Sequence, residues 1–577
     1  MYRCLTSVQN ASRINTGRTG RQTAREEHNA RALFSERERV MQVKNKISVR
    51  LIWLLLAVIL AVSCVSGCSG SGDAAEDEQM RDEVDFIGDA VADQGTTAEA
   101  DDKFTLRYSK EEPLNPITCD GVYNDAITSL IYEGLFRLTD KFEPVNVLCK
   151  DYTTESGSTY TFNIIDAKMH DGSDLTAEDV SYSINRARLS SKFGSRLSNI
   201  SYCTANDDNS IYVELYEADC SLPALLDIPI IKSGSVDSET PAGTGPYYFN
   251  SISGRPGLSV FKEHRNAENI TLDRIHLSAF TDASVEESFA NYTLDCIWQD
   301  TAGENPVNLY GDHEARYYGT SILQYVGFNA DTPVLNDPNM RLAVSYAVNR
   351  QLIIDEIYNG KGTAAKMLLH PEYYLYSDAW DEGYGYSAAK ISSCLAASGL
   401  DDKNSDGYLE YPVNGEHQYF ELKLVAYDGN DRKLKAAESI VENLRGVGLK
   451  VTLEALPWES YKAALINGEF DLYYAEVAVT RNFDFCSFLA PDGTLDYGKI
   501  GSEEYSVVCK NFLNAVSVAE KTAAAQALCK TVAESAPIVP VMYRQYVVYT
   551  HRGVISNFSP TVSGVFGDAA EWTVKLD

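Results

Sequence analysis

The sequence lacks the short motifs typical of covalent or metal-dependent enzymes. Neither HExxH nor GxSxG occurs in its 577 residues, and its eight histidines are scattered without partner spacing. No two of its twelve cysteines form a CxxC pair, so no zinc-ligand spacing is present either. We therefore expect neither an enzyme, nor a metal site, nor a cofactor.

Basic residues are scarce beyond the N-terminal region. The whole chain carries a formal charge of −32, with 50 Lys and Arg against 82 Asp and Glu. The first 67 residues hold 11 Lys and Arg against 4 Asp and Glu, so the rest of the chain carries −39. No basic stripe follows the first fifty residues. Such an acidic body is expected to be soluble and to repel nucleic acid.

A single long apolar run is present, near the N-terminus. Leu51–Val62 holds 12 apolar residues behind three basic ones. A membrane span needs about 20 residues, whereas this length is typical of the apolar region of a signal peptide. An uncleaved anchor helix that runs on through Cys64 is the alternative. Residues 1–40 are Arg-rich and unpatterned, and Met41 opens a good signal-peptide start, so we expect translation to begin there.

The segment after this run predicts a lipid anchor and a spacer. Val65–Cys68 resembles the lipobox of bacterial lipoproteins, in which the cysteine is acylated and becomes the first residue. Cys64 lacks the apolar residue three positions earlier, so Cys68 is favoured. Residues 69–102 then hold 12 Asp and Glu against one Arg, a composition typical of a disordered, extended tether. With residues 1–67 as signal segment, residues 68–102 would be this tether.

Beyond Cys68 the cysteines do not suggest a disulfide scaffold. Nine remain, an odd number spread thinly over the body of the protein. Buried free thiols are the expectation, and one or two bridges stay open as an alternative.

Residues 160–188 form a strand, a turn and a helix in sequence. Tyr160, Phe162 and Ile164 alternate with polar residues, as in a strand with one buried face. His170-Asp171-Gly172 has turn chemistry. Thr176 followed by Asp179 predicts a capping box at the start of a helix. The acidic residues around the histidine also suggest a catalytic cluster, but no nucleophile is near, and a helix N-terminus favours carboxylates anyway.

This corner resembles the signature of the dipeptide- and oligopeptide-binding family, the extracellular solute-binding proteins of peptide ABC importers (solute-binding family 5). The shared pattern is a YTF strand, HDG, and then TAEDV at a helix start. PAGTGPYY at 241–248 resembles the GTGPY turn of that family, and QYVGFN at 324–329 its strand between lobes. No Lys-Ser/Thr follows the glycines, which excludes a P-loop.

The resemblance implies an α/β fold of the periplasmic-binding-protein type, with two lobes and a small inserted domain. Lobe I is expected to comprise residues 103–141, 237–323 and 545–577. The inserted domain would be 142–236, and lobe II 324–544. Within these, helices are predicted over 126–136, 285–292 and 338–358, and strands alternate with helices over 421–453, as in an α/β lobe.

The resemblance also indicates ligand-binding residues. The loop RNFDFCSFL at 481–489 is similar to the family loop whose carboxylate meets the free amino group of a peptide, and spacing places Asp484 there. The sequence departs from the family in having Phe485 for proline and Arg481 nearby. Arg481 could neutralise Asp484 instead. Arg481 and Asn482, which lie in the same loop, are further ligand-binding candidates.

Further candidates come from loops elsewhere. Gly121 and Tyr123 follow an early strand and loop that lead to the cleft in the family, and Arg432, expected in a loop, could meet a ligand carboxylate. Asp402–Gly407 has the start of a calcium loop, but Val413 replaces the glutamate needed at position 12, so we interpret it as a turn.

The resulting hypothesis is a monomeric receptor, lipid-anchored outside the bacterial cell membrane. It would capture peptides by hinge closure and deliver them to an ABC permease and its ATPase subunits. A nickel chelate, a glycan or haem is the alternative ligand. An envelope enzyme or an adhesion protein on the same scaffold is the alternative class.

Overall fold

The computed structural model describes residues 103–576 apart from 304–305, 308, 310 and 414–415. These residues belong to one compact unit of the chain. The predicted signal segment, Cys68 and the acidic tether lie outside the described residues. In the part of the chain that is described, no helix is long and apolar enough to cross a membrane.

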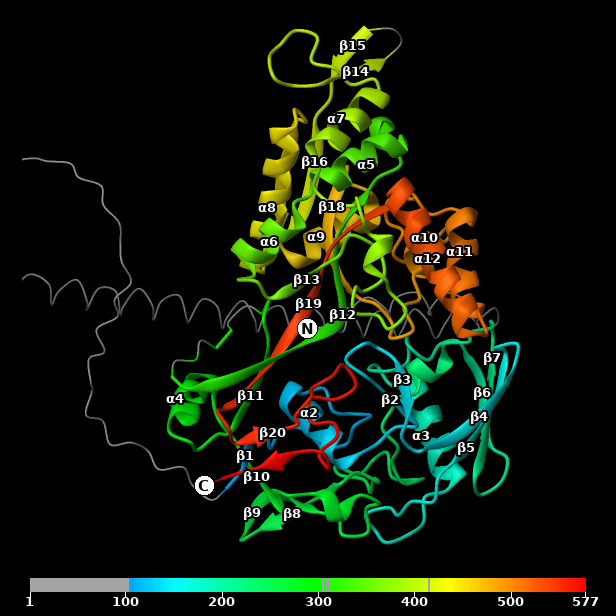
Figure 1. Cartoon of the computed structure of the whole chain (residues 1–577), viewed down its shortest axis with the longest axis vertical. Coiled ribbons are helices and arrows are strands. Elements are labelled where there is room, and N and C mark those ends of the chain that lie inside the picture. The colour runs from blue at the N-terminus through cyan, green and yellow to red at the C-terminus, as the bar shows by residue number, and fades with distance from the viewer. Residues whose placement is uncertain (1–102, 304–305, 308, 310, 414–415, 577) are drawn as a thin grey trace, which may run out of the picture. The chain divides into compact units, whose positions relative to one another are not determined.

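Two long strands run through the middle of this unit and pair with each other. β12 (His313–Phe328) and β19 (Ile538–His551) are antiparallel, with register shifts between Gly319 and Leu323 and between Gln324 and Tyr325. In Figure 1 they connect the lower part of the drawn unit to the upper part. The predicted lobe boundaries at 323/324 and 544/545 fall inside these two strands. The residue ranges of the lobes and of the inserted domain stay a prediction.

These strands belong to a seven-stranded sheet in the order β11-β19-β12-β18-β16-β17, with β13 paired to β19. Its other members are β11 (Cys296–Asp300), β13 (Gly362–Ala364), β16 (Leu422–Tyr427), β17 (Val451–Leu456) and β18 (Leu472–Ala478). Because side chains alternate along a strand, Leu424 and Ala426 enter the core on one face of the sheet and Val425 the core on the other. Helices cover both faces, as predicted from the strand–helix alternation.

The helices around this sheet come from the second half of the chain. They are α5 (Pro338–Ala347), α6 (Arg350–Ile357), α7 (Ala388–Ala397), α8 (Asp431–Gly446), α9 (Trp458–Asn467), α10 (Cys486–Leu489), α11 (Glu503–Asn514) and α12 (Val518–Ser535). The hairpin β14 (Glu410–Val413) and β15 (Glu416–Tyr419) lies at the upper tip in Figure 1. Gly407 N–H donates to Asp402 Oδ2 at 2.9 Å, so residues 402–407 form the predicted turn.

A four-stranded antiparallel sheet, β4-β5-β7-β6, carries the YTF strand. Its members are β4 (Cys149–Glu155), β5 (Thr159–Ile164), β6 (Ile200–Ala205) and β7 (Ser210–Leu215). α3 (Ala177–Leu189) packs against it through Val180 and Ile184. The capping box is confirmed, since Thr176 Oγ1 accepts from Asp179 N–H and Asp179 accepts from Thr176 N–H at 3.0 Å.

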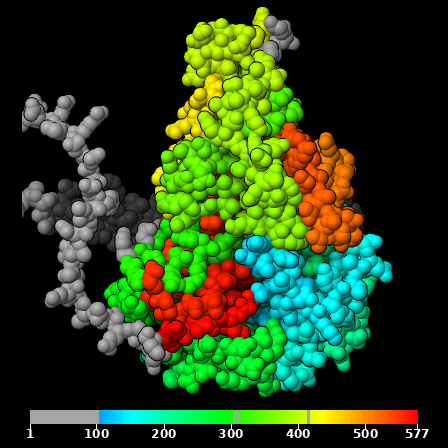
Figure 2. Space-filling model, viewed as in Figure 1, coloured from blue at the N-terminus to red at the C-terminus, as the bar shows by residue number. Residues whose placement is uncertain are grey.

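The remaining elements form a second four-stranded sheet and its surroundings. The strands, in the order β1-β10-β9-β8, are β1 (Thr105–Arg107), β8 (Tyr247–Ile252), β9 (Arg255–Val260) and β10 (Arg274–Ser278). The smaller elements are α2 (Val122–Ile131), α4 (Val285–Ala290), β2 (Phe136–Leu138), β3 (Pro144–Asn146), β20 (Ile555–Ser556) and β21 (Thr573–Val574). On the face shown in Figure 2, the C-terminal residues, in red, lie between green and cyan segments from the first half of the chain.

Two predicted helices differ from the observed ones. The helix expected over 126–136 is α2, which begins at Val122 and ends at Ile131, because Tyr132 is extended and Phe136 pairs in β2. The helix expected over 338–358 is broken into α5 and α6. Val348 and Asn349 leave the helical conformation, and the Asn349 side chain caps α6 by accepting from Leu352 N–H. The buried guanidinium of Arg350 donates to Ser345 O and Val348 O at the end of α5.

The cysteines that the structure describes form no disulfide bridge, as the sequence predicts. All nine that are described are free thiols: Cys119, Cys149, Cys203, Cys220, Cys296, Cys394, Cys486, Cys509 and Cys529.

Candidate functional site

A cavity of about 880 Å³ lies where the two long strands meet the N-terminal and C-terminal segments. Its walls come from α2, from residues 192–196 after α3, from 264–266, from 318–322 of β12, from 478–481 at the end of β18, and from 559–571. Residues far apart in the sequence thus enclose one space. Its wall also carries six aromatic side chains, those of Tyr132, Phe136, Phe193, Trp298, Tyr318 and Tyr546.

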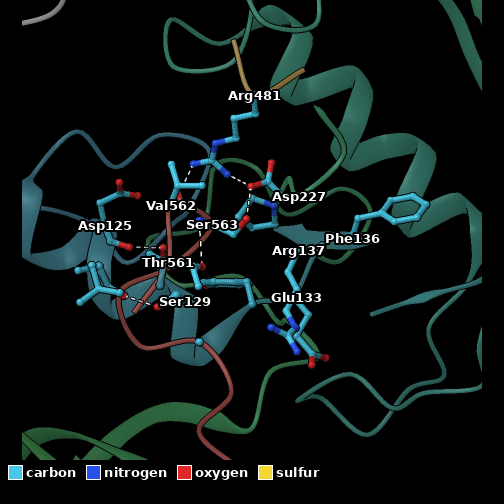
Figure 3. A pocket seen from close by; sticks show the side chains of 18 of the residues that line it. Asp125, Ser129, Glu133, Phe136, Arg137, Asp227, Arg481, Thr561, Val562 and Ser563 are labelled. Carbon is cyan, nitrogen blue, oxygen red and sulfur yellow. Dashed lines mark hydrogen bonds and ion pairs between the residues drawn. The ribbon is translucent and has the colours of Figure 1, made fainter. Parts of the chain in front are cut away.

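Arg481 reaches across one wall of this cavity to Asp227 (Figure 3). One Nη of Arg481 forms an ion pair with Asp227 Oδ2, and the other donates to Val562 O at 2.6 Å. Ser563 Oγ donates to the same Asp227 oxygen at 2.7 Å. Arg196 forms an ion pair with the second oxygen, Oδ1. Three distant segments are therefore joined at one buried carboxylate.

A second charged group lies farther along the cavity wall. Glu133 accepts from both terminal nitrogens of Arg265, at 2.8 and 2.6 Å, and His264 Nε2 lies 3.4 Å from its Oε1. Burial alone would raise the pKa of Glu133, but the hydrogen bonds from His264 and Arg265 lower it to about 2. Arg137 pairs with Asp568 at 2.6 Å.

Of the six predicted ligand-binding residues, Arg481 alone lines the cavity. Asp484 is outside this set, and its Oδ1 accepts from Cys486 N–H at 2.8 Å. The alternative that Arg481 neutralises Asp484 is wrong, because Arg481 pairs with Asp227 instead. Asn482 is buried and donates to Asp219 Oδ2 at 2.8 Å.

The other three predicted residues lie outside the cavity wall as well. Gly121 is the N-cap residue of α2. Tyr123 OH accepts from Arg107 Nη1 at 2.5 Å, and the guanidinium of Arg107 lies 3.8 Å from the centre of its ring. Their neighbours Asp120 and Val122 do line the cavity. Arg432 is in the first turn of α8 rather than in a loop, and it donates to Thr301 O.

Sequence reasoning missed Asp227 and Arg196. One signal for Asp227 was present, since it is the only charged residue in LPALLDIPII at 222–231. A lone carboxylate in an apolar run is expected to be paired when buried. Nothing in the sequence marked Arg196. Among the described residues, no group of three or more His, Cys, Asp and Glu could hold a metal ion.

Comparison with known proteins identifies the family. The profile of the bacterial extracellular solute-binding proteins, family 5, matches residues 143–494. The chain belongs to this family. Family 5 solute-binding proteins are binding proteins of transporters and not enzymes, which confirms the predicted absence of catalysis.

Curated relatives of this family 5 protein share about a quarter of the aligned residues. A Brucella ovis protein, named as an ABC transporter peptide-binding protein, is 28% identical over 316 residues, which cover 50% of this chain and 58% of the relative. The chain thus spans less than two thirds of that relative. Heme-binding protein A of Haemophilus influenzae is 24% identical, with 64% and 69% covered. The dipeptide-binding protein of Escherichia coli is 24% identical, with 63% and 74% covered.

Solved structures show that the fold is that of family 5. The unliganded open form of the periplasmic murein tripeptide-binding protein MppA has a TM-score of 0.69 at 17% identity, covering 83% of this chain and 99% of its own. AppA of Bacillus subtilis, in complex with a nonapeptide, has a TM-score of 0.56 at 18% identity, with 83% and 100% covered. NikZ of Campylobacter jejuni, in complex with Ni(L-His), has 0.57 at 17% identity, with 82% and 99% covered. The predicted two-lobed α/β fold class is confirmed.

Proposed function

We propose that this protein is the substrate-binding receptor of an ABC importer and that it binds peptides in the cavity beside Arg481. The observation that carries the proposal is the cavity itself, whose walls come from the middle of β12, from Tyr546 of β19 and from segments far apart in the chain. Its mixture of aromatic side chains and paired charges suits a ligand with both apolar and polar groups. Family membership and peptide-binding relatives support the same class of ligand.

Closure of the cavity would occur by bending of the two central strands. β12 and β19 are both continuous through the register shifts at Gly319 to Tyr325. An irregular stretch in a pair of strands absorbs changes in backbone angles more easily than a regular ladder does. The parts of the protein on either side would then approach each other around the ligand.

The same proposal includes an exported, membrane-attached receptor. Acylation of Cys68 would anchor the protein outside the cell membrane, with the acidic segment as spacer. Each buried methylene of an acyl chain contributes about 0.8 kcal/mol to membrane binding, so a doubly acylated cysteine is retained. The permease and ATPase subunits are the expected partners, and a monomer the expected form.

A thermal-shift screen of the protein tests the ligand class. Peptide libraries are compared with a nickel–histidine chelate, haem and oligosaccharides. Peptides should stabilise the protein by RT ln(1 + [L]/Kd), which is about 2.7 kcal/mol at one hundred times Kd, and should be recovered intact. Stabilisation by a chelate, haem or glycan without any peptide effect, or cleavage of the peptides, would contradict the proposal.

A further inference from the structure

The charges around Asp227 do not balance. Two guanidinium groups, those of Arg196 and Arg481, form ion pairs with this one carboxylate. The carboxylate is almost completely buried, with 1% of its side chain exposed, while the two arginine side chains keep 12% and 23%. Because each arginine carries one positive charge, the cluster has a net charge of +1 at the cavity wall.

Neighbouring groups do not remove this excess. Nη2 of Arg196, the atom that pairs with Asp227, also donates to Leu225 O, and the second terminal nitrogen of Arg481 donates to Val562 O. Neither backbone oxygen carries a full charge. Asp125, the nearest further carboxylate to act on Arg481, forms an ion pair with Lys192. Within the described part of the chain, neither arginine forms an ion pair with another carboxylate.

The remaining cations of the cavity wall are matched one to one. Arg137 pairs with Asp568, Arg265 with Glu133 and Lys192 with Asp125. Each of these pairs is neutral overall. Asp120 and Glu571 also line the cavity, so the excess positive charge is local to the Arg196–Asp227–Arg481 cluster and is not a property of the whole wall. The Arg196–Asp227–Arg481 cluster is the place on this wall where two cations share a single anion. Figure 3 shows the Arg481–Asp227 pair.

A partly buried cation without a full counter-charge favours an incoming anion. Burial lowers the pKa of Arg481 to about 10, which still leaves it protonated at neutral pH. A guanidinium group offers parallel N–H donors that fit a carboxylate, and such charge-assisted hydrogen bonds are among the stronger ones. A ligand carboxylate would neutralise the positive charge of the cluster and accept hydrogen bonds from its guanidinium groups.

We propose that the Arg196–Asp227–Arg481 cluster is a subsite for a carboxylate of the ligand. Asp227 is the positioning residue: it holds both guanidinium groups at the wall, assisted by the Ser563 hydroxyl. The inference rests on the proposed function, because it takes this cavity as the ligand site. It assigns the anionic end of the ligand to Arg481, whereas the loop pattern in the sequence suggested Arg432.

Three matched tripeptide libraries test the subsite on the whole protein. The first has free carboxyl termini and no acidic side chains. The second is the same library with amidated termini. The third is amidated but contains one Asp or Glu per peptide. The first should bind about tenfold or more tightly than the second, because a charge-assisted hydrogen bond is lost. If binding is recovered with the third library, a side-chain carboxylate can also supply the group that binds the cluster.

Variants connect this difference to the cluster. Arg481→Gln should weaken binding of the first library about tenfold or more and leave the second unchanged. Arg481→Lys keeps the positive charge but loses the parallel N–H donors of the guanidinium group, so its affinity for the first library should lie between those of the wild type and Arg481→Gln. Lys499→Gln is the matched control, since it removes one cation from an exposed pair with Asp331, outside the cavity wall. Circular dichroism and the unliganded Tm establish that each variant is folded.

The outcomes separate the two proposals. Equal binding of the acid and amide libraries by the wild-type protein, or equal loss of both in Arg481→Gln, would overturn the carboxylate subsite while peptide binding stands. If neither library binds, the proposed peptide function fails, and the subsite fails with it. The wild-type comparison needs no variant, so a misfolded Arg481→Gln does not leave the subsite untested.

Discussion

His170 Nε2 lies 3.0 Å from Gly245 O, and this contact joins the His170-Asp171-Gly172 turn to the glycine-containing turn at 241–248. Gly243 N–H donates to His170 Nδ1 at 3.3 Å, so Nδ1 is an acceptor and Nε2 carries the hydrogen that Gly245 O accepts. A neutral imidazole thus satisfies both turns. Desolvation lowers the pKa of His170, although the Gly245 carbonyl and Glu133 act in the opposite direction.

The first prediction concerns the stability of the protein in mild acid. Folded His170 takes up its proton at a lower pH than the unfolded chain, in which a histidine is protonated below a pH of about 6.5. The unfolded state then binds more protons, so the free energy of unfolding should decrease as pH falls below that value. His370 adds to this, since burial lowers its pKa to about 3. One such histidine changes stability by at most about 1.4 kcal/mol per pH unit.

Urea unfolding at pH 7.5 and 5.5 measures this effect. His170→Gln and His370→Leu should each reduce the difference between the two pH values, since neither new side chain titrates. An unchanged difference in both variants would show that these histidines are protonated in the folded protein.

The second prediction concerns the close approach of Gly245 to α2. A Cβ at this position would lie 2.5 Å from the carbonyl carbon of Ile131 and 2.6 Å from its oxygen. Gly245→Ala must therefore move backbone atoms, and overpacking of this kind costs about 1–3 kcal/mol. Gly446→Ala is the control, because no atom lies within 4 Å of its added Cβ. Equal midpoints of denaturation for the two variants would contradict this reading of the turn.

The third prediction compares two capping boxes that differ in burial. Asp179 is buried and accepts from Thr176 N–H at 3.0 Å, from Ser233 N–H at 2.8 Å and from Lys232 Nζ at 3.3 Å. Asp179→Ala removes all three partners and should destabilise the protein by about 3 kcal/mol. Glu520→Ala removes the exposed counterpart in α12 and should cost under about 1 kcal/mol. Similar losses of stability in the two variants, measured by calorimetry, would show that burial of the capping carboxylate makes no difference.

The fourth prediction concerns Asp484, whose contact with a ligand ammonium group stays a prediction. Asp484→Asn should weaken binding of peptides with a free amino terminus and have little effect on acetylated ones, because the amide cannot pair with a cation. Isothermal titration with both peptide forms measures this. Its structural role at Cys486 N–H is kept by the Asn side-chain oxygen. Equal loss for both forms would exclude an anchoring role.

Local patterns in the sequence predicted local structure well. The strand at 160–164, the turn at His170 and the Thr176 capping box each depend on residues close together in the chain, and each is observed. The break between α5 and α6 was not predictable in this way. At this break Arg350 is buried and donates to Ala365 O and Pro540 O, contacts with more distant segments that the local pattern does not indicate.

The residues of the cavity wall could likewise not all be predicted from local patterns. Arg481 was identified from its loop, but its partner Asp227 was not. Asp227 lies in a segment that resembles no family motif, and it meets Arg481 only through tertiary packing. Asp484, three residues later, was expected in the ligand site from the resemblance of its loop and from spacing; it lies outside the cavity wall, and its contact with a ligand stays a prediction. Spacing along a loop does not determine which side chains face a cavity, and here Phe483, with a positive φ of 56°, lies between them and turns the backbone.

The central claim is that the ligand is held in the cavity beside Arg481. A crystal structure of the protein with the peptide that stabilises it most tests this directly. We predict peptide density between the 478–481 segment and α2, with a carboxylate at Arg481 and the two ends of β12 and β19 bent toward each other. Density for the peptide at another surface, with this cavity empty, would contradict the account.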